Sequence, residues 1–139
     1  MVDTISTAHR SWNMSRIKGK DTRPEIALRS LLHKLGYRFR LHGAQLPGKP
    51  DIVLPKYRTV VFVNGCFWHR HPGCSKAYTP KSRIEFWEAK FAGTIERDHR
   101  KRQELERLGW SVLTVWECEL QRDPGHVLKI FQSQLREAA

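Results

Sequence analysis

Cysteine and histidine side chains, which bind metal ions well, gather in one short segment of the chain. Cys66, His71 and Cys74 have the spacing C-x4-H-x2-C. A structural zinc ion takes four nitrogen or sulfur ligands, so one ligand must come from elsewhere. Cys118 is the candidate, because it follows one apolar segment as Cys66 follows another, and adjacent parallel strands end at the same sheet edge. We therefore predict a zinc site, with His69 as the alternative nitrogen ligand; three separately buried thiols are the alternative to any metal site.

Asp51 is the carboxylate whose position best suits a hard cation. It opens the apolar segment 51–54, which a turn over residues 55–58 joins to a second apolar segment in a hairpin. Counting back from this turn places Asp51 opposite Phe62 or Val63. Mg²⁺ takes oxygen ligands, commonly one or two carboxylates together with a substrate phosphate. A Mg²⁺ site at Asp51 is one interpretation, and a turn-capping carboxylate is the other.

Water attacks a cation-bound phosphate more readily when a base removes its proton. His69 and Asp98 are the candidates, and imidazole is the side chain that titrates near neutral pH. Glu25 is a further acidic candidate. Its place in the pattern Thr22-x-x-Glu25, a helix capping box, explains that residue without any chemistry.

Phe67 and Trp68 lie in a polar turn next to a glycine, where buried aromatic rings are unexpected. One interpretation is that they cover the metal site from inside. The other is that they insert between the bases of duplex nucleic acid, as apolar wedges do in proteins that unstack base steps. Met14 and Ile17, set among basic residues near the N-terminus, are candidates for a second wedge.

The composition is that of one globular domain with a polyanionic partner. The chain has 139 residues, of which 40% are hydrophobic, enough for a single core. Lys and Arg number 25 against 14 acidic residues, which gives a net charge of +11. Nucleic acid is the commonest partner for such an excess, although charge alone also keeps a protein soluble. No apolar run is long enough to span a bilayer and no leader pattern is recognisable, so we expect a cytoplasmic protein that binds no membrane.

The spacing of apolar and capping residues predicts helices around a mixed sheet. Helices are predicted over residues 22–35, over 82–108 with a Ser82-x-x-Glu85 capping box, and after Asp123. Strands are predicted at 37–41, 51–54, 59–64 and 110–117, with a long loop at 65–80. The segment 59–64 is apolar on both faces, which is typical of a central strand covered on both sides. This order predicts one α/β or α+β domain, preceded by a basic arm over residues 1–20.

Ordered motifs along nearly the whole chain resemble the very short patch repair (Vsr) DNA mismatch endonucleases. The matching motifs are Asn13-Met14, Asp21-Thr22-x-x-Glu25, LPGKPD at 46–51, VFVxGCFWH at 61–69, Glu85-Phe86-Trp87, Glu96-Arg97-Asp98, and Gly109-Trp110 through Val115-Trp116-Glu117-Cys118. The resemblance implies an endonuclease domain over residues 21–139. Its expected fold is α/β, with a mixed central sheet flanked by helices, and is related to the restriction-type PD-(D/E)xK nucleases.

The resemblance also implies the metal ligands and the base. Zinc would be structural and held by the four residues Cys66, His71, Cys74 and Cys118. Mg²⁺ would be bound by Asp51 and the backbone carbonyl of Val63, with His69 as the base.

The substrate that the resemblance implies is duplex DNA with a T·G mismatch, the product of 5-methylcytosine deamination. Phe67 and Trp68 would enter from the major groove, while the arm with Met14 approaches from the minor groove. The expected reaction is a nick on the 5′ side of the mismatched thymine. We expect a monomer, with mismatch-repair proteins as further candidate partners.

Some positions depart from the family pattern. Asn64 replaces the second active-site histidine of the best-known member, and an amide binds phosphate but takes no proton at neutral pH. The segment between His71 and Cys74 is one residue longer, which keeps His69 open as the zinc ligand. Residues 62–64 lack the second carboxylate and the lysine usual in restriction-type folds. Two other functions therefore stay under consideration: a zinc-stapled module that binds distorted duplex without cutting, and a restriction-like nuclease for matched DNA.

Overall fold

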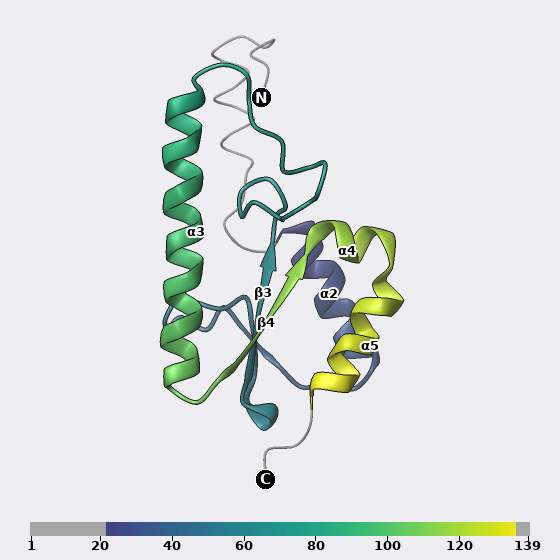
Figure 1. The fold of residues 1–139 in the computed structure, drawn as a ribbon. Coiled ribbons are helices and arrows are strands. Elements are labelled where there is room, and N and C mark those ends of the chain that lie inside the picture. Colours follow the sequence, from purple (N-terminus) through teal and green to yellow (C-terminus); the bar gives the residue numbers. More distant parts are fainter. Residues whose placement is uncertain (1–21, 136–139) are drawn as a thin grey trace.

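A mixed four-stranded sheet forms the centre of the structure, a computed structural model that describes residues 22–135 (Figure 1). Its strands, in spatial order, are β1 (Arg40–Leu41), β2 (Ile52–Leu54), β3 (Thr59–Asn64) and β4 (Ser111–Trp116). β2 is antiparallel to β1 and to β3, whereas β3 and β4 run parallel. The predicted mixed sheet is confirmed. The predicted arm at 1–20, with Met14 and Ile17, lies outside the described residues.

Helices cover both faces of this sheet. α3 (Ile84–Arg107) lies along one face, and α2 (Arg23–Lys34), α4 (Glu117–Arg122) and α5 (Pro124–Gln134) lie on the other (Figure 1). With 24 residues, α3 extends beyond the sheet, so its N-terminal half stands beside the loop that follows β3. In the part of the chain that is described, no helix is both long and apolar enough to cross a membrane.

β3 belongs to both layers because its side chains alternate between the two faces. Val60 packs with Leu105 of α3 in the smaller apolar cluster. Val61 packs with Leu28 of α2 and Phe131 of α5 in the larger one. The prediction of a central strand covered on both sides is confirmed.

The register of the parallel pair decides where the candidate site residues lie. Asn64, the last residue of β3, is opposite Trp116, the last residue of β4, so both strands leave the sheet at the same edge. β2 begins toward this edge, because it is antiparallel to β3 with Ile52 opposite Val61. The sheet thus brings the residue before β2 close to the segments that follow β3 and β4.

Two residues predicted as helix N-caps form the expected capping hydrogen bonds. Thr22 Oγ1 accepts a hydrogen bond from the Glu25 N–H at 3.4 Å, and α2 begins one residue later. Asp123 Oδ1 accepts a hydrogen bond from the His126 N–H at 3.0 Å at the start of α5. Gly36, at φ 84, follows the end of α2 as predicted, because this conformation favours glycine.

Two predicted boundaries are wrong. The Ser82 capping box does not open α3, which begins at Ile84 after an uncapped Arg83 at φ 56. The strand predicted over 37–41 is reduced to the two residues of β1. Tyr37 and Phe39 pack against the larger apolar cluster without joining the ladder, so their alternation reflects burial rather than strand pairing.

α4 is a short helix that the sequence patterns did not predict. Its six residues follow β4 directly, and so few residues show no helical period. The Glu119 carboxylate accepts a hydrogen bond from the Trp116 N–H at 3.1 Å, which stabilises the first turn. α4 therefore fixes Cys118, in that first turn, at the edge where β3 also ends.

The loop predicted at 65–80 is confirmed as a series of turns between β3 and α3. The His69 N–H donates to the Gly65 carbonyl (3.1 Å), and the His71 N–H donates to the Cys66 carbonyl (3.0 Å). Cys66 and Pro80 are the buried side chains of this loop. With so few fully buried side chains and no regular secondary structure, the loop needs other contacts to hold its shape.

We expect Phe131→Ala to lower the free energy of unfolding by about 3–5 kcal/mol, the usual cost of truncating a buried Phe. Phe131 is 1% exposed and joins α5 to the core. Its neighbour Ile130 is 37% exposed, so Ile130→Ala should cost less than about 1 kcal/mol. Urea denaturation of both variants measures the difference; equal losses would contradict this packing of α5.

Candidate functional site

Cys66, His71, Cys74 and Cys118 come together where β3 and β4 end. Their ligand atoms all lie within 4.8 Å of one another, and Cys118 Sγ is 3.4 Å from His71 Nδ1. Parallel pairing brings Cys66, after β3, to Cys118, in α4. Three sulfurs and one imidazole nitrogen at this spacing fit the donor set of a tetrahedral structural metal site. The geometry groups His71, rather than His69, with the cysteines.

The electrostatics of this cluster favour a bound cation. Cys66 is fully buried, and desolvation raises the pKa of its thiol to about 12. Cys74 is more exposed, and the backbone N–H of Lys76 is the main cause of its lowered pKa. A divalent cation would offset the cost of a buried thiolate, because it binds that thiolate directly. His71 stacks on Trp116 with ring centroids 4.3 Å apart, which fixes the plane of the imidazole.

Asp51 lies next to this edge, immediately before β2. Its N–H donates to the Val61 carbonyl at 3.0 Å, and its carboxylate accepts a hydrogen bond from the Val63 N–H at 2.7 Å. This agrees with the position predicted opposite Phe62 or Val63. Desolvation raises the pKa of the Asp51 carboxyl to about 6, with a further rise from Glu25 and an opposing effect of the Val63 hydrogen bond. A bound cation would relieve the cost of keeping this carboxylate ionised.

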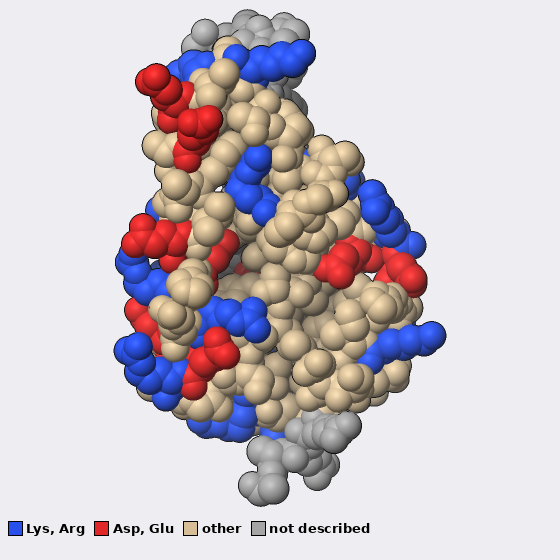
Figure 2. Space-filling view, viewed as in Figure 1, with Lys and Arg blue, Asp and Glu red and all other residues tan. Residues whose placement is uncertain are grey.

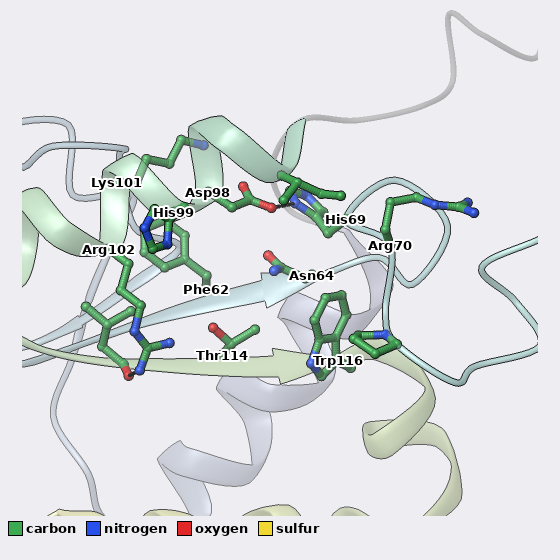
Figure 3. A pocket seen from close by; sticks show the side chains of 13 residues that line it. Phe62, Asn64, His69, Arg70, Asp98, His99, Lys101, Arg102, Thr114 and Trp116 are labelled. Atoms are coloured by element: carbon green, nitrogen blue, oxygen red, sulfur yellow. Dashed lines mark hydrogen bonds and ion pairs between the residues drawn. The ribbon is translucent and has the colours of Figure 1, made fainter. Parts of the chain in front are cut away.

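His69 and Asp98 form a pair between the loop and α3. His69 Nδ1 is 2.7 Å from Asp98 Oδ2, and the two side chains point toward each other (Figure 3). When the carboxylate accepts the Nδ1 proton, the neutral ring carries its lone pair on Nε2. The side chains are 27% and 29% exposed, so they remain accessible to a ligand in the cleft.

Two connected cavities meet at these residues. A cleft of about 840 Å³ is lined by Asp51, Val63, His69 and Asp98 among others. A second cavity of about 540 Å³ lies between α3 and the ends of β3 and β4, and it shares Asn64, His69 and Asp98 with the first (Figure 3). On the surface, a hollow lies beside α3, with both basic and acidic side chains near it (Figure 2). The Lys and Arg side chains there suit a negatively charged backbone.

Glu25 and Asn64 also line the larger cleft. Glu25 is 3% exposed, and its carboxylate accepts a hydrogen bond from the Arg29 guanidinium at 3.1 Å. Asn64 is 9% exposed, and its amide makes no hydrogen bond within the described part of the chain. A buried amide in that state is available to a ligand. The cleft therefore contains all five predicted catalytic candidates: Glu25, Asp51, Asn64, His69 and Asp98.

Phe67 is the centre of an aromatic cluster between the loop and α3. The ring centroids of Trp68, Tyr78, Trp87 and Phe91 lie 5.1 to 5.7 Å from its own. Two of these rings come from one face of α3, at positions i and i+4. Sequence analysis did not select Trp87 as a site residue, although this spacing within an exposed helix was a signal for it.

Arg70 links the loop that follows β3 to this aromatic cluster. Its guanidinium donates to the carbonyls of Tyr78 (2.9 Å) and Phe67 (3.4 Å) and lies 3.9 Å from the ring centroid of Phe91. Its backbone φ of 55 is uncommon for a residue with a side chain. Arg70 therefore ties both ends of the loop to α3, and no sequence motif had indicated it.

Comparison with known proteins agrees with this geometry. Residues 2–76 match the family model described as DNA mismatch endonuclease Vsr. The chain is 52% identical to the type II nicking enzyme V.XorIIP of Xanthomonas oryzae pv. oryzae, over 86% of this chain and 88% of that protein. It is 48% identical to the DNA mismatch endonuclease Vsr of Escherichia coli, over 86% and 76%. The chain belongs to the Vsr family of DNA mismatch endonucleases.

As a Vsr-family protein, the chain is an endonuclease that acts on DNA. Its fold is similar to that of the homing endonuclease I-Bth0305I catalytic domain, with a TM-score of 0.55 over 84% of this chain and all of that domain. At 19% identity this likeness concerns the fold alone. It confirms the predicted nuclease-like α/β architecture.

The raised pKa of Asp51 makes the stability of this Vsr-family protein depend on pH. A carboxyl whose pKa is about 6 when folded, against 3.8 ordinarily, stabilises the fold while protonated and loses that contribution as pH rises through 6. In buffer without divalent cations, Asp51→Asn should therefore raise the melting temperature at pH 7.5 and change it much less near pH 4. Melting curves across this range test it. A variant less stable at pH 7.5 would contradict the buried, unfavourable carboxylate.

Proposed function

We propose that the protein is a Mg²⁺-dependent endonuclease that nicks duplex DNA 5′ of the thymine in a T·G mismatch. The observation that carries the proposal is the meeting of Asp51 with the His69–Asp98 pair in one cleft. The aromatic cluster around Phe67 stands beside that cleft. Membership of the Vsr family supports the choice of a mismatched duplex as substrate.

Asp51 and the backbone carbonyl of Val63 would hold Mg²⁺ in this proposal. The Val63 N–H already binds the Asp51 carboxylate, which brings the two residues into contact. Mg²⁺ bound there supplies positive charge to the phosphate under attack. At neutral pH a carboxyl with a pKa of about 6 is ionised and ready to bind a cation. Glu25 adds a second carboxylate close to Asp51, although its ion pair with the Arg29 guanidinium at 3.1 Å offsets part of that charge.

His69 would take a proton from the attacking water at Nε2. Asp98 holds Nδ1 at 2.7 Å, so it orients the ring and stabilises the imidazolium that forms. Asn64 lines the same cleft and offers amide N–H groups to a phosphate oxygen. We assign Asn64 a positioning role, because an amide transfers no proton at neutral pH.

Zinc is the metal that we assign to Cys66, His71, Cys74 and Cys118. Thiolate and imidazole ligands in a four-coordinate site are typical of structural zinc. By binding four side chains of the loop and α4, the site would hold a loop that has few fully buried side chains and no regular secondary structure.

Phe67, Trp68 and Trp87 would form the wedge that enters the base stack. Trp68 and Trp87 are in contact, with ring centroids 5.9 Å apart, and both are half-buried. A T·G wobble pair is stacked less firmly than a Watson–Crick pair, so a wedge opens it at lower cost. A second wedge at Met14 and Ile17, action as a monomer, a cytoplasmic location and association with mismatch-repair proteins stay predictions.

Cys118→Ser should lose the bound metal and lower the melting temperature. Wild-type protein should contain one zinc per chain by elemental analysis, because all four ligand atoms lie within 4.8 Å. Structural zinc contributes directly to folding, so losing one of its ligands destabilises the fold. A Cys118→Ser protein that is free of zinc yet melts like the wild type would refute the site.

With Mg²⁺ at moderate salt, a T·G duplex should be nicked on its thymine strand while the matching T·A duplex stays intact. Phosphate contacts are the same in both duplexes, so the difference comes from opening the base step. Trp68→Ala should therefore reduce the preference for T·G more than it reduces binding to T·A. Nicking of labelled duplexes with varied flanks measures the preference, and a binding titration of the T·A duplex measures its affinity.

Two variants separate the outcomes of this experiment. Asp51→Asn should still bind the T·G duplex but nick it at least 10²-fold more slowly, since it lacks the proposed cation ligand. Glu96→Gln, which changes an exposed carboxylate on α3, is the matched control and should nick normally. Binding without nicking in any context would favour the non-catalytic module, and equal cutting of T·A would favour a nuclease for matched DNA.

A further inference from the structure

Lys101 of α3 lines both cavities of the site, and the roles assigned above leave it unused. It follows Asp98 by three residues, so the two side chains share one face of the helix. Figure 3 shows the Lys101 side chain running along α3 toward the end where Asp98 and His69 meet. The helix thereby brings a positive charge close to the candidate base.

The stem of Lys101 is held by contacts on two sides. A Cβ added at Gly48 would come within 2.5–2.8 Å of Lys101 Cβ, Cγ and Cδ, so the loop before β2 lies directly against the stem. Lys101 Nζ lies 5.9 Å from the ring centroid of Phe62, on β3. The side chain is half-buried, unlike most lysines. These contacts direct the ammonium group into the cleft rather than into open solvent.

Lys101 differs in its charge pairing from its neighbours on α3. Arg100 pairs with Glu96 at 2.7 Å, and Arg102 pairs with Glu106 at 3.4 Å. Lys101 forms no ion pair with any carboxylate of residues 22–135. A half-buried cation that pairs with no protein carboxylate, in a cleft for an anionic substrate, is available to bind that substrate.

We propose that Lys101 Nζ contacts the scissile phosphate and is a catalytic residue of the nicking reaction; this inference rests on the proposed function. The water oxygen bonds to phosphorus as its proton passes to His69 Nε2, and the bond from phosphorus to the 3′ oxygen of the preceding nucleotide breaks. That oxygen leaves with the electron pair and takes a proton from solvent water, while negative charge grows on the phosphate oxygens during the step. An ammonium group is a compact point charge that stabilises such oxygens. Asn64 lines the same two cavities, but its amide is neutral. Lys101 supplies the positive charge that Asn64 does not.

The test is the single-turnover nicking rate of Lys101→Met on a T·G duplex at saturating protein. Methionine keeps most of the stem that packs on Gly48 and removes the charge. We expect the rate to fall about 10²-fold or more, as when one donor to a developing oxyanion is removed, while the Kd changes less than about threefold. Lys129→Met, which removes the same charge from an exposed position on α5, should match the wild type in rate.

Alkylammonium rescue distinguishes a missing charge from a structural defect. Adding ethylammonium to Lys101→Ala should recover part of the nicking rate, whereas tetramethylammonium, which has no N–H group, should not. A rate of Lys101→Met equal to that of the wild type would overturn the assignment of Lys101 alone. Loss of rate with an equal loss of affinity, or without selective rescue of Lys101→Ala, would reduce Lys101 to a binding or structural residue. Failure of the wild type to nick any T·G duplex would instead overturn the proposed function, and Lys101 with it.

Discussion

The parallel pairing of β3 with β4 is the constraint on which the rest of the site depends. Because Asn64 lies opposite Trp116, the two strands end at the same edge of the sheet. The loop that follows β3 and the helix α4 that follows β4 therefore begin side by side. Cys66 and Cys118 are far apart in sequence, yet this pairing makes them members of one cluster. The link is reinforced by the Glu117 carboxylate, which accepts a hydrogen bond from the Cys66 N–H at 3.1 Å. A one-residue slip of the ladder would reverse the faces of β4 and separate these groups.

The two proposed cation sites beside one sheet edge differ in ligand chemistry. Sulfur and imidazole groups in the Cys/His cluster would select a soft or borderline ion and leave no open position for a substrate. Asp51 lines an open cleft, where a hard cation would keep coordination positions for water and phosphate. In both places burial makes the ionised ligand unfavourable on its own, as the raised pKa values of Cys66 and Asp51 indicate. A cation bound at either place would offset this cost by stabilising the ionised ligand directly.

The parts of this site that sequence could predict were those with a local pattern. The spacing of Cys66, His71 and Cys74 and the hairpin that positions Asp51 depend on near neighbours, and the structure agrees with both. The choice between His69 and His71 needed three dimensions, because Asp98, the partner of His69, lies on a distant helix. Such tertiary contacts leave no period in a single sequence.

Other features escaped prediction for related reasons. α4 is shorter than two helical turns, so its residues could not display the 3.6-residue period. The Ser82 pattern failed because a capping box needs an extended N-cap, whereas the chain enters α3 through Arg83 in the left-handed region. Arg70 and Lys101 carry no motif, and their importance comes from what the fold places around them.

In the proposed function, the residues for recognition and for cleavage are consecutive in the chain. Cys66 belongs to the Cys/His cluster, Phe67 and Trp68 lie against α3, and His69 is held by Asp98. Cys66 is fixed by the Cys/His cluster and the next three residues are fixed by α3, so none of the four can move far without displacing its neighbours. If the rings enter a base step, His69 is only one residue away, about 3.8 Å along the backbone. The nearest phosphate is then the one beside the opened step, which makes the position of the nick a geometric consequence of where the wedge enters.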